Sequence, residues 1–251
     1  MKKQFSLFIS ILAISILSFA VYSQPVAVDG IDALTPDRNG AESATGVGVA
    51  SQSGNTTQLM LNATKTTQHW QGYYGNITGE ITLDDADSNT LFAWTLANPT
   101  GEIFAVNTSE SVQWTNITCV NLTNATQNGL DGHGASKING TTLDDQYGIK
   151  FSEMDNFSGT FNSQFTGSIN IGDVVIDSDD ACPLTYLFVN NQSQTTDFEE
   201  LLLFDNASAL LFTAILETDQ VGFDGSLWDF QMLTAQNDSV IGTYYFYVEL
   251  S

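Results

Sequence analysis

Residues 199–217 read EELLLFDNASALLFTAILE, and their assignment decides the fold class. Two apolar runs, 201–204 and 210–216, flank Asp205 and Asn206. The Leu and Ala content also suits helices over 199–204 and 207–217, because both residues are good helix formers. Asp and Asn, however, favour tight turns between short strands. The stretch therefore predicts a β-hairpin.

Short β-favouring runs separated by Gly, Asn, Asp and Ser recur from Val47 onward, with little of the helical 3.6-residue period. Many strands with closely spaced turn signals are typical of sandwiches. We predict an all-β fold, an antiparallel β-sandwich of immunoglobulin-like or jelly-roll-like type. Residues 124–151, rich in Gly, Asn, Asp and Thr, should form one long irregular excursion. The predicted strands are 57–67, 77–83, 91–96, 102–106, 111–114, 165–176, 184–189, 201–204, 210–216 and 243–250.

Residues 1–23 are typical of an export signal. Lys2 and Lys3 precede a nearly unbroken apolar run over 5–21, and Ser23 is small enough for cleavage after it. The alternative is an uncleaved anchor, because the apolar run approaches the length that spans a bilayer. No later segment could span a membrane.

Two regions are predicted after the signal. Residues 24–45 form an extended leader, in which 25–31 is either a first strand of the domain or a free strand that completes a neighbouring subunit's sheet. Residues 46–251 form the β-sandwich, as one unit or as two subdomains divided near 124–150.

The charge balance is strongly acidic. All 29 acidic residues follow the predicted signal, which holds two of the six basic residues, so 29 acids against four bases give the mature chain a net charge of −25. Such a surface repels phosphate groups, which argues against nucleic acid and anionic lipid as partners. It suits a halophilic-type protein, because repulsion is screened within about 3 Å at 1 M salt.

The two cysteines, Cys119 and Cys182, predict a disulfide, since export delivers the chain to an oxidising compartment. Two thiols and the mature chain's two histidines are too few for a structural zinc site.

Twelve Asn-x-Ser/Thr sequons predict a surface that carries sugars, if the organism has the transfer machinery. The alternative is that an Asn- and Thr-rich chain produces sequons by chance. The candidate glycosylation sites are Asn55, Asn62, Asn76, Asn107, Asn116, Asn121, Asn124, Asn139, Asn156, Asn191, Asn206 and Asn237.

Asp85, Asp87 and Asn89 alternate as at the start of many calcium loops, and their oxygens suit a hard cation. They are our candidate metal ligands, with calcium as the only cofactor considered. The rest of an EF-hand loop is missing, since Thr90 stands where Gly is needed and Leu96 where Glu belongs. The competing interpretation is a solvated hairpin turn. Asp177, Asp179 and Asp180 form a second acidic cluster with the same two interpretations.

No catalytic constellation stands out, and we predict that the chain is not an enzyme. His133, in the run Asp-Gly-His-Gly, and His69, beside Trp70, are the obvious candidate bases, but no Gly-x-Ser-x-Gly nucleophile elbow accompanies them. Paired carboxylates for glycoside hydrolysis are a further alternative, because acids abound and their separation is invisible in sequence.

Six aromatic residues could stack against sugars, although most aromatics of a β protein pack in its core or across strands. They are Trp70, Tyr73, Tyr74, Trp94, Trp114 and Trp228.

Two stretches stand out. The first comprises HWQGYYGNITG at 69–79 and NPTGEIFA at 98–105, and the second comprises FEELLLF at 198–204, GFDG at 222–225 and YYFYVEL at 244–250. They resemble uncharacterised exported β-rich surface proteins of archaea, especially of small-genome lineages, and the resemblance covers about half of the mature chain. The resemblance implies an archaeal surface protein and carries no known catalytic or binding residues.

These observations favour a secreted structural protein of the cell surface, such as an envelope or filament subunit, whose partners are its own copies or other envelope proteins. The alternative is an adhesin or carbohydrate-binding module that binds glycans. A secreted hydrolase is a third hypothesis.

Overall fold

The computed structural model describes residues 24–31, 50–61, 64–96, 98–108, 112–122, 140–207, 209–237 and 242–250. Within them the chain is mostly β-structure, with antiparallel sheets and few helices, which confirms the predicted all-β, sandwich-like class. The predicted signal, residues 1–23, lies outside the described residues.

The main sheet has eight strands in the described part of the chain, and all of their pairings are antiparallel. β5 lies between β16 and β12, so strands from before and after 124–150 share one sheet. β6 (Thr118–Cys119) pairs with β11 beside the main path. The strand order is β1 (Val26–Ala27), β16 (Tyr245–Leu250), β5 (Gly101–Val106), β12 (Leu210–Ile215), β11 (Glu199–Phe204), β10 (Pro183–Tyr186) and β7 (Ser163–Gln164).

The decisive stretch is a hairpin, as predicted: β11 and β12 pair in register, with Leu202 opposite Phe212. Asp205 closes the turn, because its Oδ1 accepts hydrogen bonds from the Ala207 and Ala209 N–H groups, at 2.9 and 2.8 Å. Asn206 takes the left-handed φ of 61° that Asn tolerates well. The apolar residues do not alternate with polar ones, because both faces of these strands are buried; Thr213 is the one polar residue within the runs 201–204 and 210–216.

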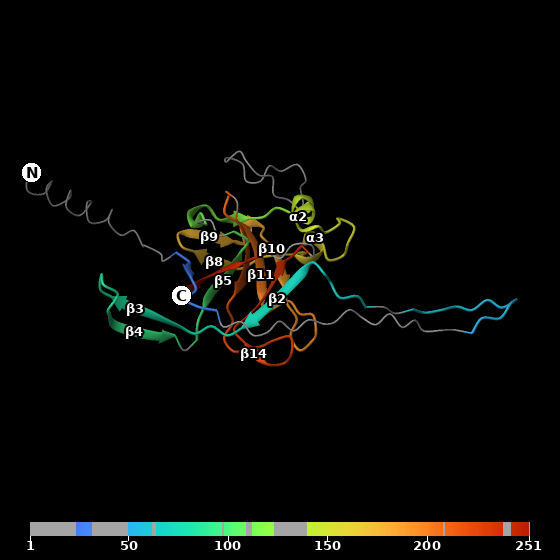
Figure 1. The fold of residues 1–251 in the computed structure, drawn as a ribbon, viewed down its shortest axis with the longest axis horizontal. Coiled ribbons are helices and arrows are strands. Elements are labelled where there is room, and N and C mark those ends of the chain that lie inside the picture. Colours follow the sequence, from blue (N-terminus) through green and yellow to red (C-terminus); the bar gives the residue numbers. More distant parts are fainter. Residues whose placement is uncertain are drawn as a thin grey trace, which may run out of the picture.

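Both faces of the main sheet are covered (Figure 1). On the first face, Ala105, Leu202 and Phe212 lie in one core cluster with residues of two helices and of the β2–β15 pair. On the second, Phe104 and Leu203 lie in another cluster with the β8–β9 hairpin and a 3-10 helix. The covering elements are β2 (Trp70–Gly75), β15 (Phe230–Ala235), α2 (Gly140–Tyr147), α3 (Phe157–Thr160), β8 (Ser168–Ile171), β9 (Val174–Asp177) and η1 (Trp114–Asn116).

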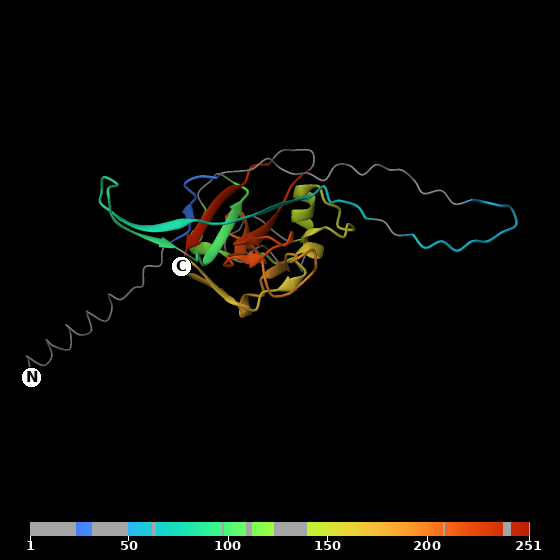
Figure 2. The ribbon, with the colours of Figure 1, turned by 90° about the horizontal axis from the view of Figure 1, so that it is seen from below.

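Two small hairpins stand outside these layers. β3 (Gly79–Asp84) and β4 (Thr90–Leu96) pair with each other and project from the body, as Figures 1 and 2 show. β13 (Gln220–Val221) and β14 (Leu227–Trp228) form the other pair. A short 3-10 helix, η2 (Ser178–Asp180), follows β9.

Several predictions of secondary structure were wrong. The described residues of 57–67 lie in no strand. Leu59, Met60 and Leu61 are exposed, and they pair with no strand of the described residues. Residues 112–114 are no strand either, because Trp114 begins η1. The sequence also missed β2, β15 and helix α2, which lies inside the predicted irregular excursion. The first strand was correct, since β1 within 25–31 pairs with β16 of the same chain.

Candidate functional site

The β3–β4 hairpin has one apolar face that no described residue covers. Ile81 pairs with Trp94, and Leu83 pairs with Phe92, so these four side chains share a face. Each is about half exposed. The Phe92 and Trp94 rings meet edge to face, with centroids 4.9 Å apart. All residues between Gly79 and Leu96 are exposed, and no other strand of the described residues pairs with the hairpin.

The tip of this hairpin is a turn that Asp85 organises. Its Oδ1 accepts hydrogen bonds from the N–H groups of Asp87 and Asn89, both at 2.9 Å. The Asn89 side-chain nitrogen donates to both carboxylate oxygens of Asp85. This hydrogen bonding from Asn89 lowers the pKa of Asp85. The geometry matches the hairpin-turn interpretation, and calcium binding by Asp85, Asp87 and Asn89 stays a prediction.

A second exposed apolar patch lies on the body. The Tyr74 ring meets the rings of Phe223 and Trp228 edge to face, each at 5.0 Å. The Trp228 indole N–H donates to Asp224 Oδ1 at 3.0 Å. Leu227, Tyr74 and Phe223 are exposed. We call Tyr74, Phe223, Leu227 and Trp228 the aromatic patch; its β14 part lies on the lower edge of the body in Figure 1.

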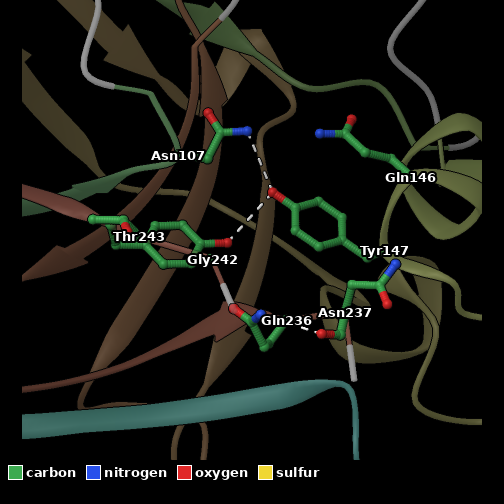
Figure 3. Close-up of a pocket in the computed structure, with 8 residues that line it drawn as sticks. Asn107, Gln146, Tyr147, Gln236, Asn237, Gly242 and Thr243 are labelled. Carbon is green, nitrogen blue, oxygen red and sulfur yellow. Dashed lines mark hydrogen bonds between the residues drawn. The ribbon is translucent and has the colours of Figure 1, made fainter. Parts of the chain in front are cut away.

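A pocket of about 290 Å³ opens between β5, α2 and the chain that joins β15 to β16 (Figure 3). None of the described residues that line it is charged, although the chain as a whole is strongly acidic. Amides and hydroxyls dominate the lining, which comprises Asn107, Gln146, Tyr147, Gln236, Asn237, Gly242, Thr243 and Tyr244.

The floor of the pocket is a hydrogen-bonded network. The Asn107 side-chain nitrogen donates to the Tyr147 hydroxyl at 3.3 Å, and the two point toward each other in Figure 3. Asn107 Oδ1 accepts from the Leu210 N–H at 3.1 Å. The Tyr244 hydroxyl donates to the Ala235 carbonyl oxygen at 2.6 Å and lies 3.4 Å from the Tyr147 hydroxyl. Burial raises the pKa of both tyrosines, so they stay neutral donors and acceptors.

Two buried glutamates lie in the core layers. Glu200 is fully buried, and its Oε2 accepts a hydrogen bond from the Leu233 N–H at 2.8 Å, which ties β15 to the main sheet. Glu200 Oε1 has no hydrogen-bond partner among the described residues. Burial raises the pKa of Glu200 well above its usual value.

Glu102 pairs across β5 and β16 with Glu249. Burial, and then the nearby Glu249 charge, raises the pKa of Glu102 to about 8. Glu249 accepts the Gly172 N–H at 3.0 Å. The structure thus brings two carboxyl groups together, which the sequence could not locate; Glu102 is buried and Glu249 is partly buried.

His69 is the one candidate base that the structure describes; His133 lies outside the described residues. His69 Nε2 lies 3.5 Å from Glu153 Oε2, and its buried Nδ1 has no hydrogen-bond partner in the described chain. Neighbouring Trp70 packs edge to face on Phe157, at 5.1 Å, and its indole N–H donates to the Asp155 carbonyl oxygen. This surrounding is structural packing.

The six candidate stacking aromatics divide by location. Trp70 and Tyr73 pack against the first-face core, and Trp114 packs between Phe104 and Tyr247. Tyr74 and Trp94 are exposed and Trp228 is partly exposed, so these three belong to the two apolar patches described above.

The sequon side chains differ in accessibility. Asn156 is buried and caps α3: its Oδ1 accepts from the Gly159 N–H, and its Nδ2 donates to the Phe151 carbonyl oxygen at 2.7 Å. A sugar on that nitrogen would disturb its contact with the Phe151 carbonyl oxygen. Asn62, Asn124 and Asn139 lie outside the described residues. Asn107, Asn206 and Asn237 are partly buried, whereas the exposed sequons are Asn55, Asn76, Asn116, Asn121 and Asn191.

Cys119 and Cys182 form the predicted disulfide, with Cα atoms 4.8 Å apart. It joins β6 to the residue before β10 and indicates a non-reducing environment for the folded chain. In the second acidic cluster, Asp177 and Asp180 form a capping box around η2. Asp177 Oδ1 accepts a hydrogen bond from the Asp179 N–H, and Asp180 Oδ2 accepts one from the Asp177 N–H. The described residues contain no group of three or more His, Cys, Asp or Glu that could hold a metal ion.

None of the helices in the described ranges is long and apolar enough to cross a membrane. Comparisons of this chain with protein-family models, with curated proteins and with solved structures found no match.

Proposed function

We propose that this chain is a structural subunit of a cell surface, in an envelope or filament, which associates with copies of itself. The observation that carries the proposal is the uncovered apolar face of the β3–β4 hairpin, made by Ile81, Leu83, Phe92 and Trp94. A lone two-stranded hairpin is marginally stable in water. Contiguous exposed apolar surface marks an interaction site. The hairpin therefore gains its stability from whatever covers it.

The chain offers a second copy two different apolar surfaces, the hairpin face and the aromatic patch around Tyr74. When one surface of a subunit binds a different surface of the next, the contact repeats head to tail. Such contacts build rings or open filaments. This pair of surfaces suits a polymerising subunit better than a protein that works alone.

Charge sets the conditions for this assembly. Copies that each carry about 25 net negative charges repel one another at low salt. The repulsion has a range of about 30 Å at 0.01 M salt and about 3 Å at 1 M. Association through apolar faces is therefore expected in concentrated salt and not in dilute buffer.

The proposed location is extracellular, at the cell surface. The disulfide fits an oxidising compartment. The predicted export signal, the exposed sequons and the resemblance to archaeal exported proteins support the same location. The proposal includes no catalytic step: Glu102 is buried, and His69 lies beside Trp70, which packs on Phe157.

Replacing Trp94 or Leu83 with Ser on the hairpin face is expected to convert assemblies of the mature protein in 1 M salt to monomers. Each change removes apolar contact area from the proposed interface, while the body, which the hairpin does not cover, keeps its unfolding free energy within about 0.5 kcal/mol. Light scattering after size-exclusion chromatography measures the mass.

The matched controls are Thr82→Ser and Thr95→Ser, which lie on the opposite, polar face of the same strands and should leave assembly intact. A wild-type protein that stays monomeric at every salt and protein concentration would refute the proposal. Chelation of calcium in the same experiment tests the prediction for Asp85, Asp87 and Asn89.

A second candidate function is carbohydrate binding, favoured by the neutral pocket. Uncharged amides and hydroxyls around an aromatic ring are the groups that bind a neutral polyhydroxyl compound. If the pocket binds sugars, Gln146→Ala should weaken binding about tenfold, as expected for one lost hydrogen bond. Gln192→Ala, exposed elsewhere, is the control. A glycan array without hits in the native salt would contradict this function.

A further inference from the structure

We propose that β1 exchanges between copies: in the assembled protein, the N-terminal strand of one subunit pairs with β16 of its neighbour. The inference rests on the proposed self-association and names a contact that would link the subunits. The partner is a second copy of this chain, and the segment that it contributes is residues 24–28.

Residues 24–28 dock on the sheet edge through a small, self-contained contact. Val26 and Ala27 are paired with Val248 and Tyr247, and the Val28 N–H donates to the Phe246 carbonyl oxygen at 3.4 Å. The Pro25 side chain is buried, and Val28 packs against the first-face core cluster. These contacts need only five residues, whichever chain they come from.

In the described part of the chain, the edge that receives the segment is paired over only part of its length. β5 pairs with all six residues of β16 on one side, whereas β1 pairs with two of them on the other. Open strand edges accept an added strand through backbone hydrogen bonds. Because β1 pairs with this edge through only two residue pairs, the same strand of another chain can replace it there.

The connection from this segment to the rest of the domain is long. Residues 29–69 separate it from β2, and the described part of that connection contains no helix or strand. Residues 50–61 lie well away from the body in both views (Figures 1 and 2). Forty-one residues can reach about 140 Å when extended, which is more than enough to reach a neighbouring subunit.

The balance between the two arrangements depends on concentration. The docked segment makes the same contacts whether it binds its own chain or a neighbour. The two arrangements therefore differ only in the connection between the segment and the rest of its chain. A connection of this length holds its segment at an effective concentration of about millimolar or less. Subunits packed side by side in an assembly present their β16 edges at similar concentrations. Exchange is therefore expected in assemblies, and the closed arrangement in dilute monomers.

Ala27 and Tyr247 provide the test, because they form a non-hydrogen-bonded pair, whose Cα atoms lie about 4.5 Å apart. That spacing suits a disulfide. We would mix Ala27→Cys protein with Tyr247→Cys protein, assemble the full mature chains in 1 M salt, and oxidise. Exchange predicts disulfide-linked pairs of the two variants in the assembled fraction, identified by mass mapping, with Cys119–Cys182 intact.

Tyr245→Cys replaces Tyr247→Cys in the control mixture. It lies on the same strand and face but two residues out of register, where the spacing is too long for a disulfide, so linked pairs should be several-fold fewer. The double variant Ala27→Cys/Tyr247→Cys measures closed pairing directly, as a disulfide within one chain.

The outcomes separate the two proposals. Assemblies that contain only disulfides within single chains would overturn exchange and leave the proposed function standing. Linked pairs without large assemblies would support exchange and overturn the structural-subunit function. Neither assemblies nor linked pairs would overturn both.

Discussion

Replacing both Cys119 and Cys182 with Ala is expected to lower the free energy of unfolding by about 4 kcal/mol. The disulfide spans 63 positions in sequence, and closing a loop of that length restricts the unfolded chain by about this amount in the chain-entropy model. For a domain of this size, the melting temperature should fall by roughly 8–16 °C.

The position of the disulfide explains why the rest of the fold does not make up for the stability that is lost with it. It anchors β6, a strand of two residues, beside β11 and next to the start of β10. The closed loop contains α2, α3 and the β8–β9 hairpin, which cover both faces of the main sheet. Without the link, these covering elements lose a fixed attachment point.

Urea unfolding in constant high salt, with and without reductant, measures this effect. Reductant should destabilise the wild type and leave the Cys119→Ala/Cys182→Ala variant unchanged. A loss below about 1 kcal/mol would show that the reduced chain already restricts this loop, contrary to the entropy argument.

The central strands of the main sheet were predicted well, because residues close together in the sequence determine them. β5, β11 and β12 are mostly apolar and are bounded by clear turn residues, and Asp205 organises its turn through contacts within five residues. Elements of this kind need little information from the rest of the chain. The disulfide was equally easy to predict from the sequence, because the chain has only two cysteines.

Helix α2 and the β2–β15 pair of the covering layer were missed because tertiary contacts decide them. α2 reads GTTLDDQY, with few strong helix formers, and its buried Leu143 and Tyr147, four residues apart, hold it on the core. β2 contains two glycines, and its partner β15 lies more than 150 residues later. The described residues of 57–67 show the opposite case: their sequence alternates, but they pair with no other strand and form none themselves.

The candidate sites follow the same rule. Alternation over 77–83 and 91–96 identified two strands, and pairing them places Ile81, Leu83, Phe92 and Trp94 on one face. Alternation does not tell whether another layer covers that face. The pocket was not predicted either, because Asn107, Tyr147 and Tyr244 come from distant segments and show no common motif.

Raising the pH from 5 to 8.5 is expected to destabilise the wild-type protein, and Glu102 should supply a large share of the loss. Its pKa is about 8 in the folded protein, against an ordinary value of 4.5 for a free glutamate. Between these values, the folded state retains a proton that the unfolded state has released, so stability falls as pH rises. The contribution of Glu102 is fully present below pH 4.5 and is lost as pH rises through about 8.

The size of this effect follows from the linkage relation. Each unit of pKa difference corresponds to about 1.4 kcal/mol, so Glu102 alone accounts for a loss on the order of 4 kcal/mol. Glu200 acts in the same direction, because burial also raises its pKa. Ionisation of Glu200 would place a buried charge beside β15. Its Oε2 accepts a hydrogen bond from the Leu233 N–H, but its Oε1 has no hydrogen-bond partner among the described residues.

Glu102→Gln isolates the effect, because glutamine keeps the shape of the side chain and cannot ionise. Urea unfolding at pH 5, 7 and 8.5 in constant salt should show a flatter dependence on pH than in the wild type. Glu80→Gln removes one exposed carboxylate from the hairpin, with the same change in net charge, and should leave the wild-type slope unchanged. If both variants change the slope equally, general repulsion among acidic groups, and not burial at Glu102, governs the response to pH.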